Sequence, residues 1–106
     1  LKLYLARAGY ETDTAENGLE ALRLLESGLY DVVITDAVMP GMTGFELCER
    51  IRAKYPHIRV IGMTGAVNVN DFGQSGAHAW FYKPVPFREL HKAIQRLCQE
   101  DSPAAM

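Results

Sequence analysis

Residues 31–44 read Asp31-Val32-Val33-Ile34-Thr35-Asp36-Ala37-Val38-Met39-Pro40-Gly41-Met42-Thr43-Gly44, and this stretch decides the fold. A short apolar run bounded by turn residues is typical of a buried strand in a parallel sheet. Asp36 closes the run, so its carboxylate is predicted outside the carboxyl end of the strand, where open α/β sheets place their chemistry. Its position makes Asp36 a candidate site residue.

Two further polar residues close apolar runs in the same way. Thr64 ends the run Val60-Ile61-Gly62-Met63, and Lys83 ends the run Trp80-Phe81-Tyr82. A carboxylate, a hydroxyl and an ammonium at three strand ends would converge on one crevice. The carboxylate can take a phosphoryl group as an acyl phosphate, and the other two groups can bind and neutralise its oxygens. Each residue alone has a simpler explanation, as a cap or a solvated side chain, but their shared position predicts a phosphoryl site.

With these residues in place, the chain resembles the receiver domain of bacterial two-component response regulators. The matching motifs cover the chain from Leu1 to about Gln99, and they are Asp36 with Met39–Gly44, Met63-Thr64-Gly65, Gly76-Ala77, Trp80 and Lys83-Pro84. The resemblance implies a role for each site residue: Asp36 as phosphoacceptor, Thr64 as switch hydroxyl, Lys83 as charge partner of the phosphoryl group, and Trp80 as the aromatic that reorients with Thr64. It also implies Mg²⁺ as cofactor, with Asp36 and the backbone carbonyl of Val38 among its ligands.

The beginning of the chain departs from the receiver pattern. Receivers open with a strand that ends in an acidic pair, which holds Mg²⁺ beside the phosphoacceptor. Here residues 1–8 have the spacing and composition of a helix, and Gly9 suits the position after its end. We therefore expect the first strand and its acidic pair to be missing from this chain. Because Leu1 is not an initiator Met, we expect a fragment, or residues upstream, rather than a cleaved signal peptide.

The missing strand would be an interior one, since the usual strand order of this fold is 2-1-3-4-5. Its loss would leave two sheet edges with unpaired backbone groups, at about 1–3 kcal/mol each. Three outcomes are open: the strand lies upstream, Tyr10–Ala15 pairs directly with Asp31–Thr35, or a second copy supplies a strand and forms a dimer. We favour the first. In the direct-pairing case Asp13 or Glu16 would lie beside Asp36 as a replacement magnesium ligand.

The other elements alternate as in a βαβα chain. Strands are predicted at residues 10–15, 58–63 and 79–82, and helices at 18–27, 43–54 and 86–99. Thr43 and Glu46 form a capping-box pattern at the start of the second of these helices. Residues 67–76 are rich in Asn, Gly and β-branched residues and predict a short or irregular fourth helix. The fold class is therefore α/β, a flavodoxin-like doubly wound parallel sheet of the (βα)5 receiver type, with an N-terminally truncated receiver domain at residues 1–100 and a tail at 101–106.

Composition limits the function further. The 106 residues are 48% hydrophobic and can bury one modest core, and no apolar stretch approaches the length of a transmembrane helix. A formal charge of −2 gives no basic footprint, so we expect no direct contact with nucleic acid. Cys48 and Cys98 lack disulfide or metal-site spacing and predict buried structural roles in a reducing cytoplasm, and the three histidines are isolated as well.

These predictions describe a phosphorylation-controlled signalling switch, not a turnover enzyme. A sensor histidine kinase or a histidine phosphotransfer protein would supply the phosphoryl group, Asp36 would promote its own phosphotransfer, and the product would change binding to an effector that the sequence does not name. An aspartate-nucleophile hydrolase is disfavoured because it commonly needs a second carboxylate two residues on, where this chain has Val38. The stronger alternative is a pseudo-receiver, a protein-interaction module that is never phosphorylated, which applies if the gene lacks the acidic pair.

Overall fold

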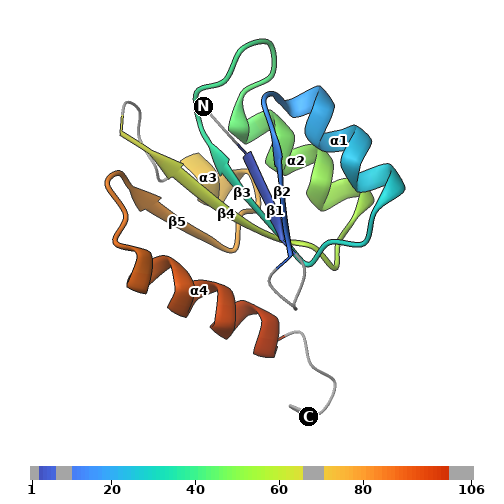
Figure 1. The fold of residues 1–106 in the computed structure, drawn as a ribbon. Coiled ribbons are helices and arrows are strands. Elements are labelled where there is room, and N and C mark those ends of the chain that lie inside the picture. The colour runs from blue at the N-terminus through green and yellow to red at the C-terminus, as the bar shows by residue number, and fades with distance from the viewer. Residues whose placement is uncertain (1–2, 7–10, 66–70, 101–106) are drawn as a thin grey trace.

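A five-stranded sheet with helices on both faces forms the domain in the computed structural model, which describes residues 3–6, 11–65 and 71–100 (Figure 1). The strand order is β2-β1-β3-β4-β5. The strands are β1 (Leu3–Ala6), β2 (Thr12–Ala15), β3 (Val32–Asp36), β4 (Arg59–Thr64) and β5 (Ala79–Tyr82). The helices are α1 (Gly18–Ser27), α2 (Gly44–Lys54), α3 (Asp71–Gln74) and α4 (Phe87–Glu100).

The parallel half of the sheet, β3–β4–β5, matches the sequence prediction. All residues of β3 are buried, because α1 and α2 cover one face of the strand and α4 covers the other. Val33 packs into the cluster on the α1–α2 side, and its neighbour Ile34 packs into the cluster on the α4 side. A strand buried on both faces needs apolar residues at successive positions, which explains the continuous apolar run.

The first strand is present, so the prediction that this fold lacks it is wrong. Residues 3–6 form β1, not the helix predicted for residues 1–8, and β1 fills the interior position of the sheet. It runs antiparallel to both neighbours, with Leu5 opposite Asp13 of β2 and Val33 of β3, so the sheet is mixed and the prediction of a wholly parallel sheet is wrong. Direct pairing of β2 with β3, one of the three outcomes considered, is therefore also wrong. Gly9, the expected helix terminator, lies outside the described residues.

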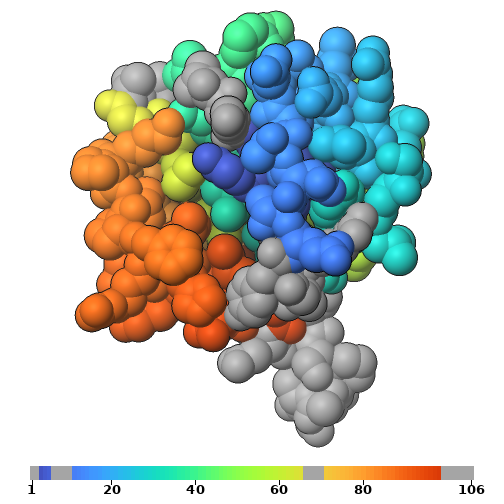
Figure 2. All heavy atoms as spheres, viewed as in Figure 1, coloured from blue at the N-terminus to red at the C-terminus, as the bar shows by residue number. Residues whose placement is uncertain are grey.

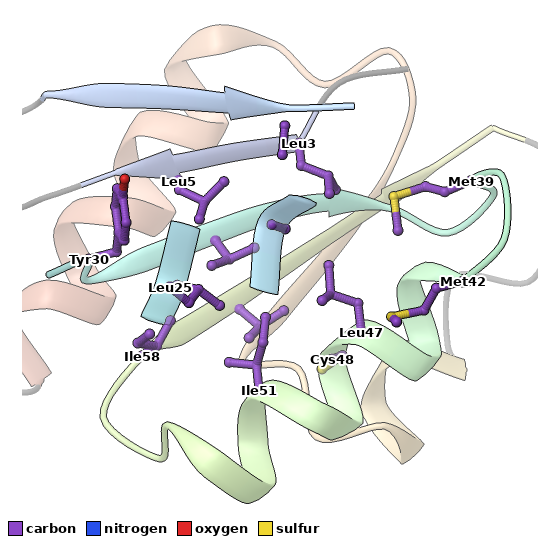
Figure 3. Packing of buried hydrophobic residues seen from close by; sticks show 14 residues of the cluster. Leu3, Leu5, Leu25, Tyr30, Met39, Met42, Leu47, Cys48, Ile51 and Ile58 are labelled. Carbon is purple, nitrogen blue, oxygen red and sulfur yellow. The ribbon is translucent and has the colours of Figure 1, made fainter. Parts of the chain in front are cut away.

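Alternation of side chains explains why residues 3–6 form a strand. Leu3 and Leu5 point into the buried cluster that α1 and α2 cover (Figure 3), whereas Tyr4 between them points to the other face and is 39% exposed. Helix propensities differ by at most about 0.7 kcal/mol for ordinary residues. Each unpaired backbone group in an open interior position would cost about 1–3 kcal/mol. Pairing with two neighbouring strands therefore outweighs the local preference for a helix.

The remaining elements agree with the sequence prediction. Residues 12–14 of β2 are exposed at the edge of the sheet (blue in Figure 2), as their polar alternation indicated. The Asn17 side chain caps α1, and Thr43 and Glu46 form the predicted capping box of α2. The predicted weak fourth helix is the single turn α3, while residues 66–70 lie outside the described part of the chain. In the described ranges no helix has both the length and the apolar character to cross a membrane.

Candidate functional site

Three strand ends meet at one edge of the sheet because β3, β4 and β5 are parallel. Hydrogen bonds of the ladder continue past the last paired residues. The Ala37 N–H donates to the carbonyl of Met63 at 3.1 Å, and the Lys83 N–H donates to the carbonyl of Thr64 at 2.9 Å. These bonds hold the ends of the three strands in register, so Asp36, Thr64 and Lys83 lie at the same edge.

Asp36 and Lys83 form an ion pair at the centre of this edge. The carboxylate is buried, with the residue 6% exposed, and the Lys83 ammonium contacts its Oδ2. The Val38 N–H donates to Oδ1 at 3.3 Å. A buried charge is stable only when it is paired and hydrogen-bonded, and both conditions are met here. The arrangement places the Asp36 carboxylate, which can act as a nucleophile, beside the Lys83 ammonium. This cation can pair with the negative charge of a group that becomes attached to Asp36.

Gly44 positions the loop around Asp36, a role that the sequence analysis did not predict. Its N–H donates to the carbonyl of Ala37 at 2.9 Å. A Cβ at this position would lie 2.8 Å from the carbonyl carbon of Asp36 and closer still to its oxygen. The start of α2 therefore lies directly against the end of β3, which only glycine permits. The motif that contains Gly44 was visible in the sequence, but the close approach was not.

Thr64 and Trp80, the predicted switch pair, lie on the neighbouring strands β4 and β5. Thr64 is fully buried at the end of β4. Trp80 lies on the edge strand β5, opposite Gly62 in the register, and is 37% exposed. Its indole packs against α3, where a Cβ on Gly73 would lie 2.9 Å from the ring. The Thr64 carbonyl thus accepts from the Lys83 N–H at the edge, and the Trp80 ring lies against α3.

The described residues do not by themselves fit Mg²⁺. This cation takes near-octahedral oxygen ligands, usually from one or two carboxylates with waters. Lys83 and the Val38 N–H occupy the two oxygens of Asp36. Within the described ranges, no group of three or more His, Cys, Asp and Glu side chains is arranged to hold a metal. Asp13, considered above as a replacement ligand, instead accepts a hydrogen bond from the Tyr30 hydroxyl at 2.5 Å.

Cys48 and His78 have the structural roles that their isolation in the sequence predicted. Burial raises the pKa of the Cys48 thiol from 9.0 to about 11, although Arg52 opposes the shift. The thiol donates to the carbonyl of Ser75 at 3.4 Å and so helps to hold α2 next to α3. Nδ1 of His78 accepts from the Val60 N–H at 3.1 Å. Cys98 lies half-buried on α4, against the core cluster on that side of the sheet.

Comparisons with known proteins agree with this geometry. The family model of the response regulator receiver domain matches residues 1–95. Sporulation initiation phosphotransferase F of Bacillus subtilis is 34% identical over 93 residues, which are 85% of this chain and 75% of the relative. Transcriptional regulatory protein AfsQ1 of Streptomyces coelicolor is 35% identical over 97 residues, 90% of this chain but 43% of the relative. The chain thus spans less than half the length of that regulator.

Solved structures give the same result. The chemotaxis response regulator CheY4 of Vibrio cholerae is 35% identical, with a TM-score of 0.74 over 85% of this chain and 79% of that one. The signal receiver domain of a signal transduction histidine kinase from Syntrophus aciditrophicus is 31% identical, with a TM-score of 0.76 over 87% of this chain and 74% of that one. Both the sequence and the backbone therefore match one family over nearly the whole chain.

Proposed function

The chain belongs to the response regulator receiver domain family, and from this premise we propose that it is a phosphorylation-controlled signalling switch with Asp36 as its phosphoacceptor. One observation carries the proposal: the buried Asp36 carboxylate forms an ion pair with Lys83 at the carboxyl edge of the parallel strands. A carboxylate at that edge lies where open α/β sheets place their chemistry, and its paired ammonium can neutralise the charge that arrives.

The proposed reaction is transfer of a phosphoryl group from phosphohistidine. A carboxylate oxygen of Asp36 attacks phosphorus in line with the P–N bond, which breaks and returns its electron pair to the imidazole. The new P–O bond makes an acyl phosphate with a charge of about −1.5 to −2 where the carboxylate carried −1. Lys83 then pairs with the phosphoryl oxygens, and the Thr64 hydroxyl donates to one of them. The chain thereby promotes its own modification and turns over no metabolite.

The proposed donor is a sensor histidine kinase or a histidine phosphotransfer protein, acting in the cytoplasm. Phosphorylation would change binding to an effector domain or a downstream protein, and a dimer is one form that such a change takes. Mg²⁺ is included in the proposal only because receiver domains typically bind it. Asp36 and the backbone carbonyl of Val38 are the two ligands that this chain would offer, and a bound Mg²⁺ would screen phosphoryl charge.

Phosphoryl labelling tests the acceptor. The protein as encoded is incubated with acetyl phosphate, a small acyl phosphate donor, with and without Mg²⁺. We expect the intact mass to rise by one phosphoryl group in the presence of Mg²⁺. Asp36→Asn should abolish the increase, whereas Asp71→Asn, which changes an exposed carboxylate on α3, should leave it unchanged. Labelling that survives Asp36→Asn would remove Asp36 from the role.

Emission of Trp80 tests the switch, because it is the only Trp in the chain. When Thr64 moves toward a phosphoryl group it vacates space, and an aromatic neighbour gains apolar burial by entering it. We expect the emission to shift when beryllium trifluoride, a phosphoryl mimic, binds with Mg²⁺. The Thr64→Ala variant should bind the mimic and lack the shift. An equal shift in that variant would leave Trp80 as a packing residue.

A pseudo-receiver is the alternative that one observation favours. Among the described residues, no group of three or more His, Cys, Asp and Glu side chains is arranged around Asp36 to hold a divalent cation. A protein-interaction module with this fold would keep the Asp36–Lys83 pair for stability and would never be phosphorylated. The labelling experiment separates the two functions: a folded protein with no mass increase in saturating Mg²⁺ and acetyl phosphate is a pseudo-receiver.

A further inference from the structure

The single turn α3 depends on tertiary contacts for its position. A helix of four residues cannot persist alone, because nucleation is unfavourable and only propagation repays it. Asp71, Gly73 and Gln74 are exposed, whereas Phe72 is fully buried. The ring of Phe72 is therefore the contact that holds this turn against the sheet.

Phe72 lies directly on the backbone of β4 at Gly62. A Cβ on Gly62 would lie 2.6 Å from Cδ1 of Phe72 and closer still to two other ring carbons. Gly62 and Thr64 are two residues apart on one strand, so they share a face of the sheet. The ring thus occupies the space above β4 that a side chain at position 62 would fill, next to the strand end that carries Thr64.

The same ring also contacts the strand end that carries Asp36. Phe72 shares a buried cluster with Ala37, the residue that follows Asp36. It packs on Phe45 of α2, with the ring centroids 4.7 Å apart and the planes tilted by 53°. One side chain of α3 therefore touches β4, the end of β3 and α2. Packed cores transmit displacement because they contain few voids.

The next residue of the turn contacts the aromatic of β5. The Trp80 ring lies so close to Gly73 that a Cβ there would be 2.9 Å away. Consecutive residues of α3 are thus in contact with two strands, Phe72 with β4 and Gly73 with Trp80. Both contacts require glycine, at position 62 on the strand and at position 73 on the helix. Displacement of either strand would shift the turn.

We propose that Phe72 is a positioning residue that couples the Thr64 end of β4 to α3, with Gly62 as the small residue that seats its ring. The coupling is a property of the packing and exists before any phosphoryl transfer. Its use in signalling rests on the proposed function: movement of Thr64 toward a phosphorylated Asp36 would reach the exposed surface of α3 through Phe72.

Hydrogen exchange in the unphosphorylated protein tests the coupling. The amides of Ser75 and Ala77 report on α3, since they donate to Asp71 and Phe72. Gly62→Ala should displace the ring and speed exchange of these amides by about tenfold, the effect of a moderate overpacking. In a Phe72→Ala background the same substitution should change exchange less than about threefold, because alanine lacks the three ring carbons that the new Cβ would meet.

Two control substitutions leave the contact between Phe72 and Gly62 unchanged. Gly65→Ala places a Cβ at ordinary distance from Lys83, 3.7 Å from its Cβ, and Phe87→Leu changes an exposed ring on α4. Neither should alter exchange at Ala77. An equal effect of Gly62→Ala in both backgrounds would overturn the coupling. If Gly62→Ala alone fails to fold, recovery of folding in the Phe72→Ala background supports the proposal, and failure of the double variant where Phe72→Ala alone folds refutes it.

A second arm separates the coupling from the proposed function. Beryllium trifluoride with Mg²⁺ should change exchange at Ala77 in the wild-type protein. In Phe72→Ala the mimic should still bind, as followed by fluorine NMR, and the response at Ala77 should fall at least about threefold. Binding with an undiminished response refutes the coupling and leaves the phosphoacceptor intact. If the mimic does not bind the wild-type protein, the phosphoacceptor proposal fails, and the exchange data without mimic still decide the coupling.

Discussion

The parallel half of the sheet and its antiparallel pair, β1–β2, are built on different principles. In the parallel half, β3 and β4 share a register of five residue pairs, and β3 is buried on both faces. In β1–β2, residues 12–14 are exposed, and Leu3, Leu5 and Ala15 make the contacts with the core. The parallel half has so many contacts that the loss of any single one should leave the sheet intact. The β1–β2 pair depends on the few side chains that point into the core at alternate positions.

The strands of the parallel half are specified by their own local sequence, whereas the conformation of β1 is imposed by the strands on either side of it. The strands of the parallel half are apolar runs bounded by turn residues, and the candidate site residues follow at their ends. Residues 3–6 carry a weak helical signal, yet they form a strand because β2 and β3 both present backbone groups to them. Tertiary context overrides propensity where propensity is weak and unpaired groups are many.

The largest expected effect is that of Leu5→Ala. If β1 is an interior strand, this substitution leaves a cavity in the cluster that α1 and α2 cover, and it should lower the free energy of unfolding by about 2–5 kcal/mol. Tyr4→Ala, one residue away and on the half-exposed face, should lower it by less than about 1.5 kcal/mol. Urea denaturation measures both. Similar values for the two variants would show that the segment does not alternate as a strand.

Gly44→Ala should damage the parallel half at the site itself. Its Cβ would overlap the backbone of Asp36, so α2 must move away from β3, at a loss of about 1–3 kcal/mol or more. Gly65→Ala, at the same edge but with its Cβ at an ordinary contact distance of 3.7 Å from the Lys83 Cβ, is the control and should change stability by no more than about 0.5 kcal/mol. Thermal unfolding measures the pair. A neutral Gly44→Ala would contradict the close approach of α2 to Asp36.

Tyr30→Phe tests how β2 is tied to the rest of the molecule. The Tyr30 hydroxyl, just before β3, donates to Asp13 of the edge strand. Its loss should lower stability by about 0.5–1.5 kcal/mol and speed hydrogen exchange in β2 more than in β4. Tyr82→Phe, which changes an exposed tyrosine on β5, serves as the matched control. Equal exchange changes in β2 and β4 would mean that the bond stabilises the whole sheet and not its edge.

A further prediction concerns alkaline pH and Cys48. Burial raises the pKa of this thiol from 9.0 to about 11, so the folded state holds its proton after the unfolded state has lost it. The unfolded state binds fewer protons in that window, and stability therefore falls as pH rises from about 9 to about 11. Cys48→Ala should remove this part of the pH dependence, whereas Cys98→Ala should not. Urea denaturation across the window measures it, and identical slopes for wild type and Cys48→Ala would contradict the shift.

The sequence by itself determined the parallel half and the residues at its edge. Asp36, Thr64 and Lys83 each close an apolar run, and parallel strands bring their carboxyl ends to one side, so their proximity followed from pattern and topology. The capping-box pattern of Thr43 and Glu46 likewise predicted the start of α2, because a capping box involves residues only three positions apart. Glycine-rich, β-branched composition likewise predicted that α3 would be short.

Only the tertiary structure decided what depends on residues distant in the chain. The direction of β1 follows from the backbone groups of two strands that come later in the sequence, and no local signal in residues 3–6 encodes them. Phe72 packs on Gly62, and Gly44 lies against the backbone of Asp36. Both contacts form only because glycine has no side chain at these two positions. A glycine in a sequence does not say what fills its space, because that is set by the packing of the whole domain.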